Sequence, residues 1–84
     1  MQIEWKLVAI KQIKKIPNPD KQRIFTQVES LEDGLEEKTN IKKLINHQFD
    51  YRLRVGNYRV LFNVHECIQI ISIEEVKKRD ERTY

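Results

Sequence analysis

The apolar positions in the first part of the chain predict a short strand followed by two amphipathic helices. Ile3 and Trp5 alternate with polar neighbours, which is the period of a strand with one buried face. After Lys6 the apolar residues recur every three or four positions, which is the period of a helix with one buried side. They form two groups, first Leu7, Ala9, Ile10, Ile13 and Ile16, then Ile24, Val28, Leu31 and Leu35.

Prolines and a glycine set the limits of these helices. Pro17 ends the first helix, because proline lacks an amide donor and disfavours helical geometry in the residue before it. Asn18 or Asp20 can then cap the second helix, and Gly34 marks its end. We therefore expect a helical hairpin joined by a short turn.

The rest of the chain predicts three strands. Residues 36–50 are polar and irregular, with only a weak indication of a turn at 41–45. From residue 51 the period changes to two, and strands over 51–55 and 58–64 flank Gly56-Asn57, a pair suited to a two-residue hairpin. After a turn at 65–67, isoleucines on both faces of residues 68–76 predict a strand in the middle of the sheet.

This order of elements predicts an α+β fold, β-α-α-β-β-β, with the helical hairpin packed on one face of a small, mainly antiparallel, twisted sheet. Eighty-four residues make one domain, 1–84, because each of two smaller units would be too short to be stable. Cys67 has no partner for a disulfide, and no apolar run approaches the roughly 20 residues that span a bilayer. With no secretory signal pattern at the start, we expect a soluble, cytoplasmic protein without a membrane partner.

Charge adds a candidate site, because arginine is concentrated late in the chain. The net charge is only +3, but five of the seven basic residues after position 50 are arginine, whose planar fork fits phosphate oxygens. Arg52 and Arg54 share one face of their strand, and Arg59 follows just past the turn. Cations this close repel one another unless an anion or a carboxylate relieves them. A phosphate site is one interpretation, and outward arginines paired with carboxylates such as Glu74 and Glu75 are the other.

Beyond single residues, the second half of the chain resembles the bacterial RelE/ParE toxin superfamily, specifically its RelE-type branch. The resemblance lies in YRLRVGNYRVLF at 51–62, the isoleucine-rich strand that follows, and KKRDERTY at 77–84, while the first half matches in element order and polarity. It implies the fold above and a toxin of a type II toxin-antitoxin system, monomeric on its own. Such toxins are ribosome-dependent messenger-RNA endonucleases, so the implied partners are a cognate antitoxin, the ribosome and messenger RNA.

The resemblance also assigns roles to single residues. The implied reaction is attack of a ribose 2′-hydroxyl on the adjacent phosphate, without a metal or cofactor. The catalytic residues that it implies are Arg54, Arg59, Arg79 and Tyr84. The residues that it implies for substrate and phosphate binding are Arg52, Lys77, Lys78 and Arg82.

One departure from the family pattern leaves the proton acceptor open. The best-studied pattern has lysines where this chain has Arg52 and Arg54, and arginine stays protonated near neutral pH, so neither can serve as the general base. Tyr84 can orient or deprotonate the 2′-hydroxyl. His47 is a further candidate base, since imidazole titrates near neutrality, and an ordinary loop histidine is the alternative interpretation.

Two other functions remain open at this point. A ParE-like protein would bind DNA gyrase on the same scaffold without catalysing a reaction. A catalytically inactive RNA-binding member of the fold is the third hypothesis. The cationic set with a terminal tyrosine favours the nuclease, because catalysis needs these groups and gyrase binding does not.

Overall fold

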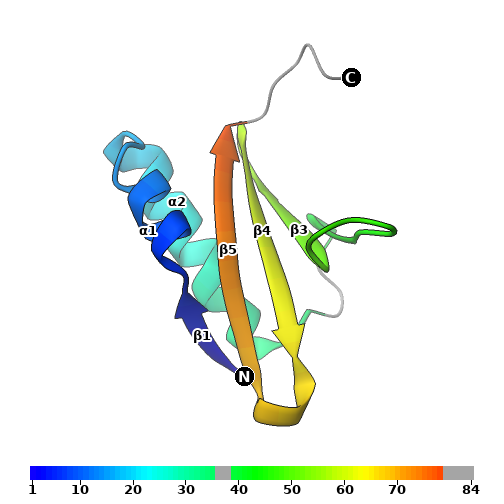
Figure 1. Cartoon of the computed structure of the whole chain (residues 1–84). Helices are drawn as coiled ribbons and strands as arrows, with labels where there is room; N and C mark the ends of the chain where they lie inside the picture. The colour runs from blue at the N-terminus through cyan, green and yellow to red at the C-terminus, as the bar shows by residue number, and fades with distance from the viewer. Residues whose placement is uncertain (36–38, 79–84) are drawn as a thin grey trace.

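The computed structural model describes residues 1–35 and 39–78 of the chain. Within them, five strands form one mixed sheet in the order β1-β5-β4-β3-β2 (Figure 1). The elements are β1 (Gln2–Trp5), α1 (Leu7–Ile13), α2 (Asn18–Glu29), the 3-10 turn η1 (Ser30–Asp33), β2 (Ile41–Lys43), β3 (Tyr51–Val55), β4 (Tyr58–His65), the 3-10 turn η2 (Glu66–Ile68) and β5 (Ile70–Lys78). The expected α+β architecture is confirmed.

The helical hairpin covers one face of the sheet, as expected, and the core lies between these two layers (Figure 1). The helices bury one side each, and Phe62 at the centre of β4 is fully buried beneath them. Tyr51 stacks on Phe62 at a ring distance of 5.4 Å, and Trp5 meets Phe25 edge-on at 5.3 Å. Aromatic pairs of this kind contribute packing energy beyond their buried area, so these side chains serve the core.

The start of α2 differs from the expectation. Pro17 is its N-cap and no side chain caps the helix, so the expected cap by Asn18 or Asp20 is wrong. Pro19 lies in the first helical turn, where a missing amide costs no hydrogen bond because the amides there lack helical partners anyway, so α2 can begin right after Pro17. At the other end η1 extends the helical path to Gly34, whose φ of +114° ends it as predicted.

A strand was missed in the sequence. Residues 36–50 predicted no strand, but β2 pairs antiparallel with β3, setting Lys42 opposite Arg52. β2 is only three residues long and Ile41 is its one apolar residue, so the sequence shows no alternation that would predict a strand. It adds an edge to the sheet next to the arginine-bearing strand.

The remaining strands follow the prediction more closely. Gly56 has a φ of +56° in the β3–β4 turn, as a two-residue hairpin requires. β5 lies between β1, to which it is parallel, and β4, so its predicted interior position is confirmed. It begins at Ile70 rather than 68, because η2 and the left-handed Gln69, with a φ of +56°, make the turn.

A bulge between β4 and β5 decides which side chains face away from the helices. Leu61 pairs with Glu75 but Phe62 pairs with Ile73, which leaves one extra residue in β5. The bulge shifts the alternation by one position. Ile73 and Val76 therefore both lie on the helix side, and Glu75 and Lys77 lie on the other.

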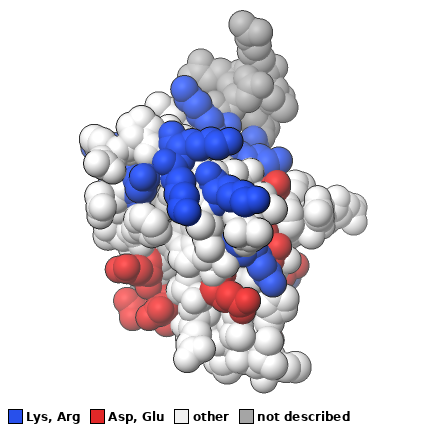
Figure 2. All heavy atoms as spheres, turned by 60° about the vertical axis from the view of Figure 1, so that its left-hand side comes forward, with Lys and Arg blue, Asp and Glu red and all other residues white. Residues whose placement is uncertain are grey.

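The surface on the helix side is divided by charge. Lysines and arginines gather towards one end of the molecule, and acidic residues gather towards the other end (Figure 2). No helix among the described residues is both long and apolar enough to cross a membrane.

Candidate functional site

The sheet face away from the helices, called the open face here, brings together basic residues from four strands. Residues paired across neighbouring strands point to the same face. The register pairs Lys42 with Arg52, Arg54 with Arg59, and Arg59 with Lys77. Arg52 and Arg54 share this face, as expected, and the register shows that Arg59 and Lys42 lie on it as well.

A cavity of about 390 Å³ lies on the open face. Its floor is formed by side chains of β3, β4 and β5, namely Arg52, Arg59, Leu61, Glu75 and Lys77. Its wall is the segment 44–49, called the wall loop here, which contributes Leu44, Asn46, His47, Gln48 and Phe49. The cavity thus combines cations on a rigid sheet with a loop that closes one side.

Hydrogen bonds fix the wall loop at its base. The Leu44 amide donates to the Asp50 carbonyl at 2.8 Å, which closes the loop on itself. Asp50 then joins it to β4, because its amide donates to Asn63 Oδ1 at 2.8 Å and its Oδ2 accepts from the Val64 amide at 3.2 Å. Phe49 is only 8% exposed, so an apolar anchor supplements these bonds.

The orientation of His47 changes its expected chemistry. Its Nδ1 accepts a hydrogen bond from the Phe49 amide at 3.1 Å. A neutral imidazole has one accepting and one donating nitrogen, so the proton is on Nε2. His47 does line the cavity, but it offers a donor to a bound anion. It would have to give up the bond from Phe49 before it could act as a base.

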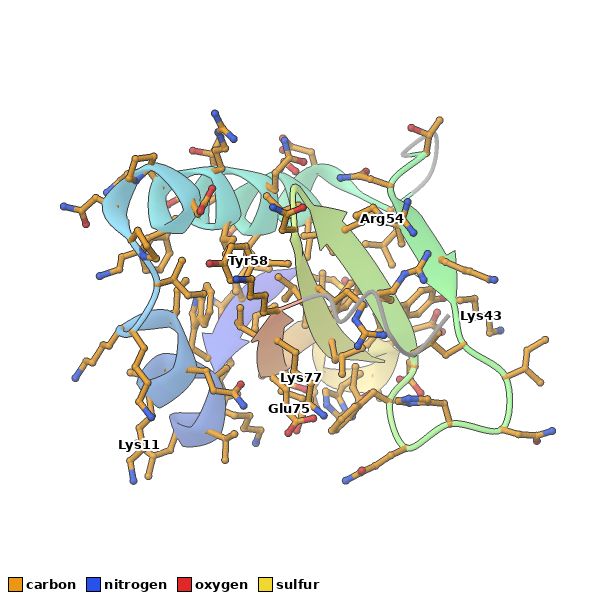
Figure 3. All side chains as sticks on the ribbon, turned by 90° about the horizontal axis from the view of Figure 1, so that it is seen from above. Lys11, Lys43, Arg54, Tyr58, Glu75 and Lys77 are labelled. Carbon is orange, nitrogen blue, oxygen red and sulfur yellow. The ribbon has the colours of Figure 1, made fainter. Side chains whose placement is uncertain are left out.

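The charges in the cavity favour an anion. Arg52, Arg59 and Lys77 line it together with a single carboxylate among the described residues, that of Glu75. Glu75 Oε2 lies 3.4 Å from Lys77 Nζ, and both residues point to the same side of the sheet in Figure 3. The Nε of Arg52 is buried and has no hydrogen-bond partner among the described residues. A buried donor without an acceptor is costly, and a bound phosphate oxygen would satisfy it.

The other expected site residues are not all in this cavity. Arg54 is exposed and lines a different cavity, beside α2. Lys78 pairs with Tyr58, so its register position is on the helix side. Arg79, Arg82 and Tyr84 lie outside the described residues.

Two features of the cavity were not anticipated as parts of a site. Glu75 was considered only as a surface partner for arginine. The bulge places it beside Lys77 on the cavity floor, and a bulge leaves no clear trace in hydrophobic periodicity. Apart from His47, the wall loop was not anticipated, because its position depends on Asn63 and Val64 in a distant strand.

Comparisons with known proteins place this geometry in context. The family model described as the ParE toxin of the type II toxin-antitoxin system parDE matches residues 3–82. No curated protein matches the chain.

Solved structures show the same fold. A chain of the archaeal RelE-RelB complex from Pyrococcus horikoshii OT3 is 26% identical, with a TM-score of 0.78 over 95% of this chain and 96% of that one. A chain of the RelB-RelE antitoxin-toxin complex from Methanococcus jannaschii is 27% identical, with a TM-score of 0.71 over 89% and 88%. The isolated E. coli RelE toxin is 15% identical, with a TM-score of 0.80 over 95% and 85%.

Proposed function

The chain belongs to the ParE toxin family of type II toxin-antitoxin systems, and on this premise we propose that it is a metal-independent endoribonuclease that cuts messenger RNA on the ribosome. The observation that carries the proposal is the cavity on the open face. Arg52, Arg59 and Lys77 face one carboxylate there, and the buried Arg52 Nε lacks an acceptor. A phosphate group would supply the missing acceptor and balance the charge.

In the proposed reaction the ribose O2′ forms a bond to phosphorus while the bond from phosphorus to the leaving O5′ breaks. The products are a 2′,3′-cyclic phosphate and a 5′-hydroxyl end. Negative charge builds up on the non-bridging oxygens, and Arg52 and Arg59 stabilise it as preorganised donors on a rigid sheet. His47 adds the Nε2 hydrogen as a further donor.

The 2′-hydroxyl proton needs an acceptor, and we assign it to Glu75. Arg52 and Arg59 stay protonated, and the Nδ1 of His47 already accepts the Phe49 amide. The Glu75 carboxylate lines the same cavity, with its side chain 24% exposed. A carboxylate can take the proton directly or through one water.

The family resemblance supplies roles for residues beyond the described ones. Arg79 donates a hydrogen bond to the leaving O5′, which takes its proton from a water molecule, and Tyr84 orients the 2′-hydroxyl or stacks on a base. Arg82, Lys77 and Lys78 add positive charge that attracts the RNA backbone.

The proposed partners follow from the same premise. The matching archaeal structures are complexes of RelE with RelB, the latter named an antitoxin in one of them. We assign this chain a cognate antitoxin that blocks the open face. The site has a volume of only about 390 Å³, so the ribosome holds the message in line for attack. A protein acting on ribosomes works in the cytoplasm.

The test in cells is expression of the chain without an antitoxin. Growth should stop, and translated messages should acquire new 5′-hydroxyl ends within codons. Arg59→Ala should abolish the new ends. Lys11→Ala removes a charge at an exposed position of α1 that does not line the cavity, and it should leave the new ends unchanged. Arrested growth with intact messages would overturn the proposal.

Inhibition of DNA gyrase is the second candidate, because the matching family model is described by ParE. It requires a binding surface and no proton transfer. Accumulation of gyrase-DNA breaks in the same cells, without new message ends, would favour it.

A further inference from the structure

A second cavity, of about 420 Å³, lies between α2 and the end of β3. Arg23 and Arg54 line it from opposite sides, one from the helix and one from the strand. Gln22, Thr26, Gln27 and Asn40 supply amide and hydroxyl groups, and none of its lining residues is acidic. Asp20 is 3.9 Å from Arg23, but this pair is exposed and such pairs are weak.

The strand side of this cavity is fixed to the helix side by Asn40. Its Nδ2 donates to Gln27 Oε1 at 3.2 Å and to the Arg54 carbonyl at 3.3 Å. The Arg54 amide donates in turn to the Asn40 carbonyl at 2.9 Å. The backbone that carries Arg54 is therefore held at a set place beside α2.

The two cavities are neighbours on the sheet. Arg54 of the second cavity pairs directly with Arg59 of the first across the β3–β4 hairpin. Figure 3 shows the labelled Arg54 apart from the Glu75 and Lys77 pair, beside β3. Directly opposed residues on neighbouring strands have Cβ atoms about 4.5–5.5 Å apart, so the side chains of Arg54 and Arg59 start close together.

We propose that Arg23 and Arg54 bind the phosphate adjacent to the scissile one. This inference rests on the proposed function and deepens it. It moves Arg54 from the reacting phosphate to its neighbour and gives Arg23 a positioning role. Gln22 and Thr26, which take no part in the Asn40–Gln27 hydrogen bond, offer hydrogen bonds to a base edge, which favours RNA over a protein carboxylate as the ligand.

The experiment tests whether each arginine acts through the negative charge of one particular phosphate. Purified toxin is given ribosomes programmed with a message in which one link next to the cut is a neutral methylphosphonate, on the 5′ side or the 3′ side in turn. The quantity measured is kcat/KM for wild type, Arg23→Ala, Arg54→Ala, and the control Lys11→Ala. Arg23 and Arg54 are exposed, so their removal should leave the fold intact, which thermal unfolding checks.

Each arginine variant should lose about tenfold in kcat/KM on the unmodified message, as expected for a charge-assisted hydrogen bond. On the message with the neutral link at the contacted position, the kcat/KM of wild type should fall by a similar factor. The arginine variants should then have the same kcat/KM as wild type on that message. Lys11→Ala should follow wild type on both.

Other results would overturn the inference and separate it from the proposed function. If wild type cuts no message, the nuclease proposal fails and this one fails with it. If wild type cuts and the arginine variants cut equally well, or lose the same factor on every message, only the adjacent-phosphate site fails. Normal cutting by the variants together with weakened binding of the antitoxin would assign the cavity to a protein carboxylate instead.

Discussion

Replacing Arg52 by methionine should stabilise the free protein while it destroys phosphate binding. The Nε of Arg52 is buried without a hydrogen-bond partner among the described residues, and Lys42 stands opposite it on β2. Methionine keeps a long apolar side chain and removes both the unsatisfied donor and the like charge. A buried unsatisfied donor costs about 1–3 kcal/mol, and a like-charge pair across strands adds to that cost.

Part of this gain is lost. Among the guanidinium nitrogens of Arg52, only Nε is a buried donor without a partner in the described residues, so the substitution also removes favourable interactions of the others. We therefore expect Arg52→Met to raise the free energy of unfolding by about 1 kcal/mol. For a domain of this size that corresponds to an increase in Tm of about 4–8 °C. Urea unfolding followed by circular dichroism measures the free energy, and calorimetry measures Tm.

Binding of inorganic phosphate tests whether Arg52 belongs to an anion site. Phosphate that binds only the folded state should raise the Tm of wild type and should raise that of Arg52→Met much less. Lys42→Met is the control that removes the like charge alone and keeps the buried Arg52 donor; because Lys42 is exposed, the unfolding free energy should change by less than about 0.5 kcal/mol. If Arg52→Met lowers the unfolding free energy, Arg52 supports the fold itself and its buried Nε is not a net cost to the free protein.

Three further predictions follow from single residues. Glu75→Gln should slow single-turnover cleavage by about a hundredfold without unfolding the protein, since it removes the proton acceptor. The control is Glu74→Gln, which changes a carboxylate that accepts from Ser72 Oγ at 2.6 Å and does not line the cavity. Equal losses of activity in both variants would refute the assignment. Phe49→Ala should lower the unfolding free energy by about 3 kcal/mol, because it removes the buried side chain that anchors the wall loop. Ile45→Ala, at a residue 83% exposed, should change the unfolding free energy by less than about 0.5 kcal/mol in the same urea titration. Gly56→Ala should cost about 1–2 kcal/mol because of the left-handed φ in the hairpin turn, and an unchanged urea midpoint would contradict that conformation.

The parts of the fold that local pattern encodes were predictable from sequence. The two helices and the β3–β4 hairpin follow from residues close together in the chain, such as Ile24 with Val28, or Gly56 with its strands. β2 was missed because three residues cannot show a period. The cap of α2 was mispredicted because Pro19 is tolerated in the first turn, so the helix begins at Asn18 without a polar side-chain cap.

The candidate site was predictable in composition and not in shape. Alternation placed Arg52 and Arg54 on one face, and the register adds Arg59 to it. Whether two arginines share a cavity depends on what covers each of them. The wall loop covers the region of Arg52, and α2 with Asn40 borders Arg54, so the set divides between two cavities. These are contacts between distant segments, which local periodicity does not carry.

The most direct test of the central claim is cleavage by the purified protein of a message held on ribosomes. The message carries a label at its 3′ end, so that the position and the chemistry of the new 5′ end are both measured. The account predicts a cut within the codon that leaves a 5′-hydroxyl, with wild-type rates for Lys11→Ala and a loss of at least about a hundredfold for Arg59→Ala. An intact message with wild type, or equal cutting by Arg59→Ala, would contradict the claim that the cations of the open face act on an RNA phosphate.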